Sequence, residues 1–211
     1  RWAEAVKLLG AALAATLLLA ACSDDGTTET GAADGPTTTT AAGVTMAAPM
    51  AAVDVPADPS PGCGATPVVA AGETERTLTA GPIEHAYFQR VPPAHDGEVP
   101  VPLVLDFHGF LEGSAVHAAH SELGPFGDDA GFVTLTPDSG REPDRWELTA
   151  DDDVEFVEAL LDRTEAELCI DRNRVFTTGL SMGGFFSTLL SCRLSERIAA
   201  AAPVAGIAIP D

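Results

Sequence analysis

The stretch Arg174-Val175-Phe176-Thr177-Thr178-Gly179-Leu180-Ser181-Met182-Gly183-Gly184 decides the fold. Its first five residues are mainly β-branched or aromatic and predict a strand. Residues 184–190 can continue as a helix, and the pattern Gly-x-Ser-x-Gly lies between the strand and the helix. A strand, a tight turn and a helix are the context that a nucleophile elbow requires. The stretch therefore predicts that the Ser181 hydroxyl is lifted to the top of a sheet.

The position of Ser181 at a helix start makes it a candidate nucleophile. The first turn of such a helix directs its N–H groups and positive dipole end at developing negative charge. The alternative is a glycine-rich turn that carries a surface serine. The strand and helix patterns on either side favour the elbow.

Outside the elbow, strand and helix patterns alternate along the chain. Behind an Asp152-x-x-Glu155 pattern that resembles a capping box, apolar residues recur at helical spacing through Leu168. Strands are predicted at residues 73–79, 83–91, 103–107, 131–136, 174–178 and 199–204. Strands that alternate with helices predict an α/β domain with a largely parallel sheet.

The composition limits the partners of the chain. The 211 residues carry a net charge of −21, and Lys7 is the only lysine. Because there is no basic patch, nucleic acid is not expected as a partner. The length suits one domain with accessory segments.

The N-terminal residues predict export and anchoring. Residues 8–21 form an apolar run of 14 positions with one polar residue, Thr16. Such a run suits a signal peptide and is short for a membrane span. Because Cys22 follows directly, residues 1–22 resemble a bacterial lipoprotein signal, in which the cysteine is acylated and anchors the protein to the membrane. Ordinary cleavage beside an incidental cysteine is the alternative.

Residues 23–60 have the composition of a tether. They are rich in Thr, Ala, Gly, Asp and Pro and contain almost no large apolar residue. Such a segment cannot bury enough surface to offset its ordering entropy. We therefore expect the folded domain to occupy residues 61–211.

Acyl-transfer chemistry needs an activated nucleophile, a base with its orienting acid, and donors for an oxyanion. Ser181 supplies the nucleophile. One donor is expected to be the backbone N–H of Met182, directly after it. The other is expected from the loop after an earlier strand, where His108-Gly109-Phe110 lies, and we assign it to Phe110.

Several motifs together resemble one family. The run from Cys169 to Gly184 looks like the polyhydroxybutyrate depolymerase and feruloyl esterase group of α/β-hydrolases. Further segments that resemble this group are Pro61-Gly62-Cys63-Gly64, His108-Gly109-Phe110, residues 152–157 and Ala202-Pro203-Val204-Ala205-Gly206. The resemblance extends from about residue 61 to residue 209.

The resemblance implies an α/β-hydrolase fold, with a mostly parallel sheet flanked by helices. It also implies a secreted or surface serine esterase that hydrolyses carboxylic esters through an acyl-enzyme on Ser181. The substrates implied are polyhydroxybutyrate-like polyesters, acetylated or feruloylated carbohydrates, or small esters. We expect no cofactor and no metal ion. Two alternatives stay open, namely an acyltransferase of the same fold and a non-catalytic surface lipoprotein.

The chain departs from the family pattern after the serine. In this fold the acid and the histidine follow the nucleophile. Here all histidines precede Ser181, and the only aspartate after it is Asp211. We therefore expect the C-terminal part of the domain, with an Asp, a His and a Cys, to lie in a continuation of roughly 70–110 residues. His108 is expected to position the oxyanion loop rather than to act as the base.

Three further features allow a functional and a structural interpretation. His117 and His120 are three residues apart and suit a metal in principle, but no known signature is complete, so a partly exposed polar segment is favoured. Asp152 and Asp153 form a carboxylate pair, for which helix capping is favoured over metal binding or acid–base work. Trp146 suits either a substrate cleft or a packed loop.

The cysteines fit an exported protein. With Cys22 lipidated, three remain. Cys169 precedes the elbow strand and Cys192 ends the elbow helix, and those ends can lie close to each other. The family resemblance also favours a Cys169–Cys192 disulfide. Cys63 is then either free or paired with a cysteine outside this sequence.

Overall fold

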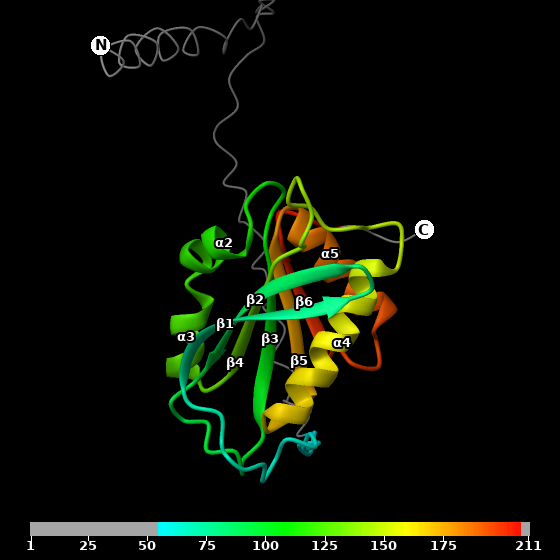
Figure 1. Cartoon of the computed structure of the whole chain (residues 1–211). Helices are drawn as coiled ribbons and strands as arrows, with labels where there is room; N and C mark the ends of the chain where they lie inside the picture. Colours follow the sequence, from blue (N-terminus) through cyan, green and yellow to red (C-terminus); the bar gives the residue numbers. More distant parts are fainter. Residues whose placement is uncertain (1–54, 208–211) are drawn as a thin grey trace, which may run out of the picture. The chain divides into compact units, whose positions relative to one another are not determined.

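The computed structural model describes residues 55–207, which contain a six-stranded mixed sheet (Figure 1). The strands are β1 (Gly72–Ala80), β2 (Ile83–Val91), β3 (Val101–Phe107), β4 (Val133–Pro137), β5 (Ile170–Leu180) and β6 (Ala200–Val204). Their order across the sheet is β1-β2-β4-β3-β5-β6. The β1–β2 and β2–β4 pairs are antiparallel, and the remaining pairs are parallel. The largely parallel sheet is as predicted.

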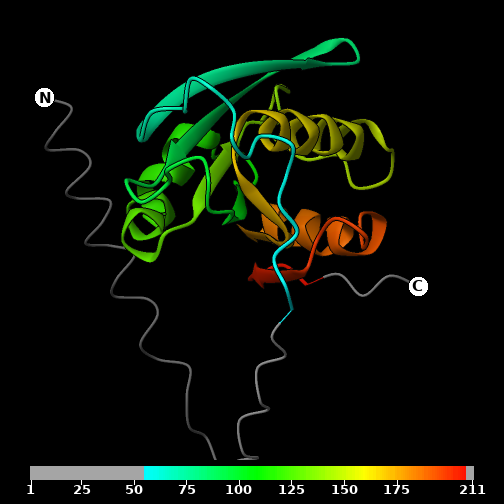
Figure 2. The same ribbon diagram turned by 90° about the horizontal axis from the view of Figure 1, so that it is seen from below.

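Helices cover both faces of this sheet. They are α2 (Ser114–Ser121), α3 (Leu123–Ala130), α4 (Asp152–Glu167) and α5 (Met182–Arg193). The view along the sheet shows α2 and α3 on one side and α4 and α5 on the other (Figure 2). Each parallel β-α-β connection therefore packs its helix back onto the sheet.

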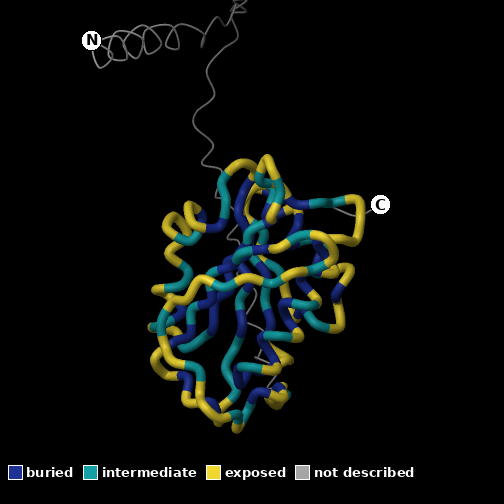
Figure 3. Tube along the Cα trace, in the orientation of Figure 1, coloured by how far each residue is buried: buried dark blue, intermediate teal, exposed yellow. Residues whose placement is uncertain are grey.

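The core lies between the central strands and the helices (Figure 3). Alternate residues of β3, including Leu103, Leu105 and Phe107, are fully buried. On α4 the buried positions include Val157, Leu160 and Leu161, at the helical spacing that the sequence predicted.

Two helices, α2 and α3, were not predicted. Residues 123–130 contain Gly124, Pro125 and Gly127, which are typical of turns and hide a helix from propensity arguments. Pro125 lies in the first turn of α3, where its missing N–H costs nothing. The predicted strand at residues 131–136 is correspondingly shorter at its start, since β4 begins at Val133.

The capping-box prediction for α4 is wrong. The helix begins at Asp152, but no acidic side chain caps its N-terminus. Asp153 is instead buried, where it accepts hydrogen bonds from the Arg141 guanidinium at 2.8 Å and the Glu147 N–H at 2.6 Å. Its carboxylate therefore ties the loop before α4 to the helix.

The predicted Cys169–Cys192 disulfide is also wrong. Cys63 pairs with Cys169, and Cys192 is exposed with a free thiol. The reason is the path of the segment before β1, which lies against the end of α4. There the Gly62 N–H donates to the Glu165 carbonyl oxygen at 2.8 Å and brings Cys63 to Cys169.

The packed part of the chain begins before residue 61. Pro59 forms a β-bridge with Asp171, and the Asp58 N–H donates to the Asp171 carboxylate. Ser60 is buried and exchanges hydrogen bonds with Ile170 through its backbone N–H and its hydroxyl. Residues 58–60 therefore belong to the domain rather than to a tether.

The predicted signal, Cys22 and most of the predicted tether lie outside the described residues. Within residues 55–207, none of the helices combines the length and the hydropathy that crossing a bilayer requires.

Candidate active site

The turn between β5 and α5 holds Ser181 in a strained conformation. Its backbone has φ 52° and ψ −109°, a region that side-chain-bearing residues rarely adopt. The Ser181 N–H donates to the Val204 carbonyl oxygen at 2.8 Å, and the Ser181 carbonyl oxygen accepts from the Phe185 N–H at 3.0 Å. These bonds to β6 and α5 hold the turn, and Ser181 itself is exposed.

Glycines are required here because backbones approach closely. A Cβ built on Gly179 would lie 2.6 Å from the Phe107 carbonyl oxygen, and one on Gly183 would overlap the same atom. A Cβ on Gly206 would overlap the Ser181 carbonyl oxygen. The Gly-x-Ser-x-Gly pattern thus lets the elbow pack directly on the end of β3.

Three aromatic rings pack against one another next to the elbow, at the end of β3 and the start of α5. Phe186 of α5 stacks on Trp146 with ring centroids 4.7 Å apart, and Phe107 of β3 meets Phe186 edge-on at 5.0 Å. The Trp146 indole N–H donates to the His108 carbonyl oxygen at 3.0 Å. Trp146 is buried, so the packed-aromatic interpretation holds and the cleft-lining one does not.

His108 is fully buried in the loop after β3, with both ring nitrogens engaged. Its Nδ1 lies 2.8 Å from the Gly109 carbonyl oxygen, and its Nε2 accepts the Ser139 N–H at 3.3 Å. These partners require a neutral ring with the proton on Nδ1. His108 therefore holds the loop and has no free nitrogen with which to deprotonate Ser181.

The loop after His108 lies beside the nucleophile. A Cβ built on Gly109 would lie 3.9 Å from the Ser181 Cβ. In the described part of the chain, the Phe110 N–H donates to no other residue. Met182 is the first residue of α5, where a backbone N–H has no partner within the helix. Both predicted oxyanion donors are thus backbone N–H groups available to a ligand.

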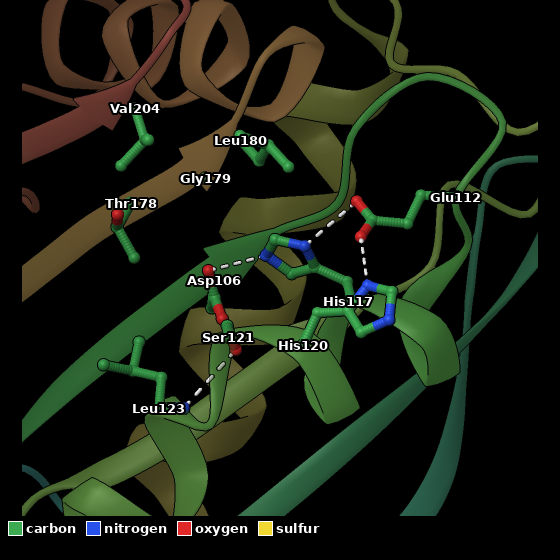
Figure 4. Close-up of a pocket in the computed structure, with 10 residues that line it drawn as sticks. All are labelled: Asp106, Glu112, His117, His120, Ser121, Leu123, Thr178, Gly179, Leu180 and Val204. Atoms are coloured by element: carbon green, nitrogen blue, oxygen red, sulfur yellow. Dashed lines mark hydrogen bonds and ion pairs between the residues drawn. The ribbon is translucent and has the colours of Figure 1, made fainter. Parts of the chain in front are cut away.

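A cavity of about 330 Å³ opens next to the elbow, on the side of the sheet that α2 covers (Figure 4). Leu180 and Val204 line its apolar wall, and Leu180 directly precedes Ser181. The opposite wall carries Asp106, Glu112 and His117. The cavity therefore combines apolar surface with a few polar groups, as ligand sites commonly do.

His117 is buried, contrary to the partly exposed segment expected from the sequence. Its Nε2 lies 2.8 Å from an Asp106 carboxylate oxygen, and its Nδ1 lies 3.1 Å from a Glu112 carboxylate oxygen. His120 is exposed, as expected. The sequence did not predict the contacts of His117 with Asp106 and Glu112. Asp106 lies in a segment predicted as an apolar strand, and Glu112 lies in a loop.

Burial and charge act in opposite directions in this cluster. Burial opposes the charged form of His117, but the hydrogen bond to Asp106 and the charges of Asp106 and Glu112 outweigh it, so the pKa of His117 is raised. Burial likewise opposes the charge of Glu112, but the hydrogen bond from the Gly109 N–H and the nearby His117 lower the pKa of Glu112.

Within residues 55–207, no group of three or more His, Cys, Asp or Glu side chains is arranged to hold a metal ion.

Comparisons with known proteins agree on one fold. No protein-family model matches the chain. An acetyl xylan esterase from Aspergillus awamori superimposes with a TM-score of 0.56 and 16% identity over 63% of this chain and 53% of that one. A ferulic acid esterase superimposes with a TM-score of 0.53 and 23% identity over 61% and 56% of the two chains. The fold is therefore that of the α/β-hydrolases.

The curated proteins that are similar in sequence are feruloyl and acetylxylan esterases. Feruloyl esterase D of Neurospora crassa is 28% identical over 161 residues, which are 71% of this chain and 54% of the relative. Feruloyl esterase B of Piromyces equi is 27% identical over 122 residues, which are 55% of this chain and 23% of the relative. A bifunctional acetylxylan esterase/xylanase of Neocallimastix patriciarum is 30% identical over 105 residues, which are 50% of this chain and 16% of the relative.

The chain is therefore similar in sequence to feruloyl and acetylxylan esterases. It spans about half the length of the Neurospora relative and less than a quarter of the other two.

Proposed function

We propose that the protein is a carboxylic ester hydrolase that works through an acyl-enzyme on Ser181. The observation that carries this proposal is the strained, exposed Ser181 at the start of α5, beside the loop of Gly109 and Phe110. In that loop the Phe110 N–H has no acceptor among the described residues. A strained serine turn next to free backbone donors is the arrangement of a nucleophile elbow with its oxyanion hole.

The chemistry proceeds in two halves. The Ser181 oxygen attacks the ester carbonyl carbon, and the carbonyl oxygen becomes an oxyanion that the Phe110 and Met182 N–H groups stabilise. The intermediate then collapses to an acyl-serine and releases the alcohol, which leaves with the proton that the Ser181 hydroxyl lost. Water attacks the acyl-serine through the same oxyanion geometry and releases the acid, which frees Ser181.

Four histidines in residues 55–207 are engaged by other groups. His108 and His117 have both ring nitrogens engaged. His85 stacks on Phe156, and His95 accepts the Cys169 N–H. We therefore assign none of these four histidines as the general base.

We propose ester-substituted carbohydrates or polyesters as substrates. The relatives are named for feruloyl and acetylxylan esters. The cavity lined by Leu180, the residue before Ser181, has one apolar wall that suits an acyl group. A panel of methyl ferulate, acetylated xylan and 3-hydroxybutyrate oligomers, incubated with the complete gene product, tests this proposal. Hydrolysis of none of the three contradicts it, and acyl transfer to an added sugar in place of hydrolysis indicates a transferase.

We propose further that the protein is exported and lipid-anchored through Cys22. The Cys63–Cys169 disulfide supports export, since disulfides persist in oxidising compartments. The replacement Cys22→Ser should leave the protein unprocessed or released from membranes. A wild-type protein that is soluble, with a mature N-terminus at another residue, contradicts the anchor.

A further inference from the structure

The loop that carries the Phe110 N–H is clamped by a carboxylate. Glu112 lies three residues after Gly109, and its carboxylate accepts the Gly109 N–H at 2.8 Å. The Glu112 backbone N–H in turn donates to the Gly109 carbonyl oxygen at 3.3 Å. Both polar groups of Gly109 are therefore held by one residue.

This clamp determines where the Phe110 N–H points. The peptide group between Gly109 and Phe110 is planar, and its C=O and N–H point in opposite directions. The Gly109 carbonyl oxygen is held from one side by His108 Nδ1 and the Glu112 N–H. The Phe110 N–H must therefore point away from these groups, and it stays free of protein acceptors.

Behind Glu112 lies the buried pair of His117 and Asp106 (Figure 4). Each ring nitrogen of His117 faces a carboxylate oxygen, and a carboxylate can only accept hydrogen bonds. Both nitrogens must therefore carry protons. The doubly protonated ring is a cation that bridges Asp106 and Glu112.

We propose that Asp106, His117 and Glu112 are positioning residues for the oxyanion loop. Asp106 holds the His117 imidazolium, and His117 holds the Glu112 carboxylate. This carboxylate holds the Gly109 N–H, while the Glu112 backbone N–H holds the carbonyl oxygen of the Gly109–Phe110 peptide, which carries the oxyanion donor for catalysis at Ser181. This inference rests on the proposed function, in which the Phe110 N–H binds the oxyanion. It extends that function by assigning a positioning role to three residues that take no part in making or breaking bonds.

The arrangement predicts which contact breaks when His117 loses a proton. A neutral ring keeps one N–H, and its other nitrogen then turns a lone pair toward a carboxylate oxygen. The Asp106 side chain is 3% exposed and that of Glu112 is 14% exposed. The second Asp106 oxygen also has no partner among the described residues. The remaining proton therefore stays toward Asp106, and Glu112 is released.

Other charged groups near α2 do not contact the His117 ring. His120, on the same helix, lies 3.6 Å from the other Glu112 oxygen. Asp138, after β4, accepts the Ser114 N–H and hydroxyl at the start of α2. Arg90 of β2 is paired with Asp128 of α3. The protonation of His117 is therefore governed by Asp106 and Glu112.

We call the chain of contacts from Asp106 through His117 to Glu112 the relay. Nuclear magnetic resonance of the full chain tests it without requiring enzymatic turnover. With nitrogen-15-labelled histidine, we expect both His117 ring nitrogens to be protonated at neutral pH. As the pH rises, the Gly109 and Phe110 amide resonances should shift with the same midpoint as His117. In Glu112→Gln the midpoint should fall by about one pH unit, because one carboxylate charge is removed, and the amide resonances should no longer follow it.

Reaction of Ser181 with a fluorophosphonate probe links the relay to the site. The labelling rate in the wild-type chain should fall as His117 deprotonates. Glu112→Gln should label about tenfold more slowly at neutral pH and should lose this alkaline decline. The matched control is Glu122→Gln, which removes an exposed carboxylate between α2 and α3 and should behave as the wild type in both experiments.

The outcomes separate the two proposals. A His117 ring with one proton at neutral pH, or Gly109 and Phe110 amides that do not follow its titration, overturns the relay. Equal labelling rates and pH profiles for wild type and Glu112→Gln also overturn it, while the proposed function stands. A wild-type chain that labels only as fast as Ser181→Ala contradicts the proposed function itself, and the positioning role falls with it.

Discussion

At the residue scale, Ser181 and His117 each keep an unfavourable state, a strained backbone and a buried charge, because neighbouring groups stabilise it. Ser181 keeps an unfavourable backbone conformation because Val204 and Phe185 bond to it on either side. His117 keeps a buried charge because two carboxylates surround it. A buried charge persists only where it is paired and hydrogen-bonded.

The protonation of His117 should appear in the pH dependence of stability. Its pKa is raised above 6.5 in the folded protein, so its contribution is fully present below pH 6.5 and is lost as the pH rises through the folded value. We expect the free energy of unfolding of the wild type, relative to His117→Gln, to decrease across this alkaline window. Urea unfolding of both proteins between about pH 6 and 9 measures the difference.

Comparison of the two proteins removes the effects of the other histidines. The pKa values of His85 and His95 are lowered, mainly by burial, and act equally in both proteins. If the two stability curves stay parallel over the whole range, His117 is not the charged group that the geometry requires.

At the scale of elements, the sequence predicted the helices and strands that have a regular spacing of apolar residues and missed those that lack it. The strands and α4 follow apolar periods of two and 3.6 residues, and the elbow has a motif of its own. In α3 such a period is interrupted by Gly124, Pro125 and Gly127. Helix α2 has only eight residues, which is too short for a period to stand out.

The sequence did not predict the Cys63–Cys169 disulfide or the cluster of Asp106, Glu112 and His117, and here the reason is different. Cys63 and Cys169 are 106 residues apart and meet only because the segment at Gly62 lies against α4. Asp106 and His117 meet only because α2 packs on β3. Contacts of this kind depend on the tertiary fold, so no pattern of neighbouring residues in the sequence predicts them.

The fit of α5 against β3 gives a prediction at this scale. Gly183→Ala should place a Cβ onto the Phe107 carbonyl oxygen and force the elbow away from the strand. We expect the free energy of unfolding to fall by about 1–3 kcal/mol and the labelling of Ser181 to decrease. Denaturant unfolding and probe labelling measure the two effects.

A second glycine replacement provides the control. Gly124→Ala, at the start of α3, should meet mainly the flexible Arg90 side chain, at 2.8 Å from its Cδ. It should leave Ser181 labelling unchanged. If Gly183→Ala is no more harmful than Gly124→Ala, the close approach at the elbow is not what requires glycine.

For the whole molecule, the disulfide joins the start of the described domain to the base of β5. A crosslink between residues this far apart in the chain restricts the unfolded state, and loop entropy gives a stabilisation of about 4–5 kcal/mol. Cys63→Ser should lower the free energy of unfolding by a large part of this amount. Urea unfolding under non-reducing conditions measures the change.

The exposed Cys192 supplies the matched control. Cys192→Ser breaks no disulfide and should change stability by less than about 0.5 kcal/mol. A larger loss in Cys192→Ser than in Cys63→Ser would show that the pairing in solution is the one first expected from the sequence.

The central claim is that Ser181 is the nucleophile of a formed elbow with two backbone oxyanion donors. Reaction of the chain with a fluorophosphonate, followed by peptide mapping, tests it most directly, with exposed Ser195 as an internal reference. Because an oxyanion donor accelerates such reactions by about 10²–10³, we predict labelling of Ser181 at least 100-fold faster than of Ser195, and none at this position in Ser181→Ala. Labelling spread evenly over the serines, or unchanged total labelling in Ser181→Ala, would contradict the account.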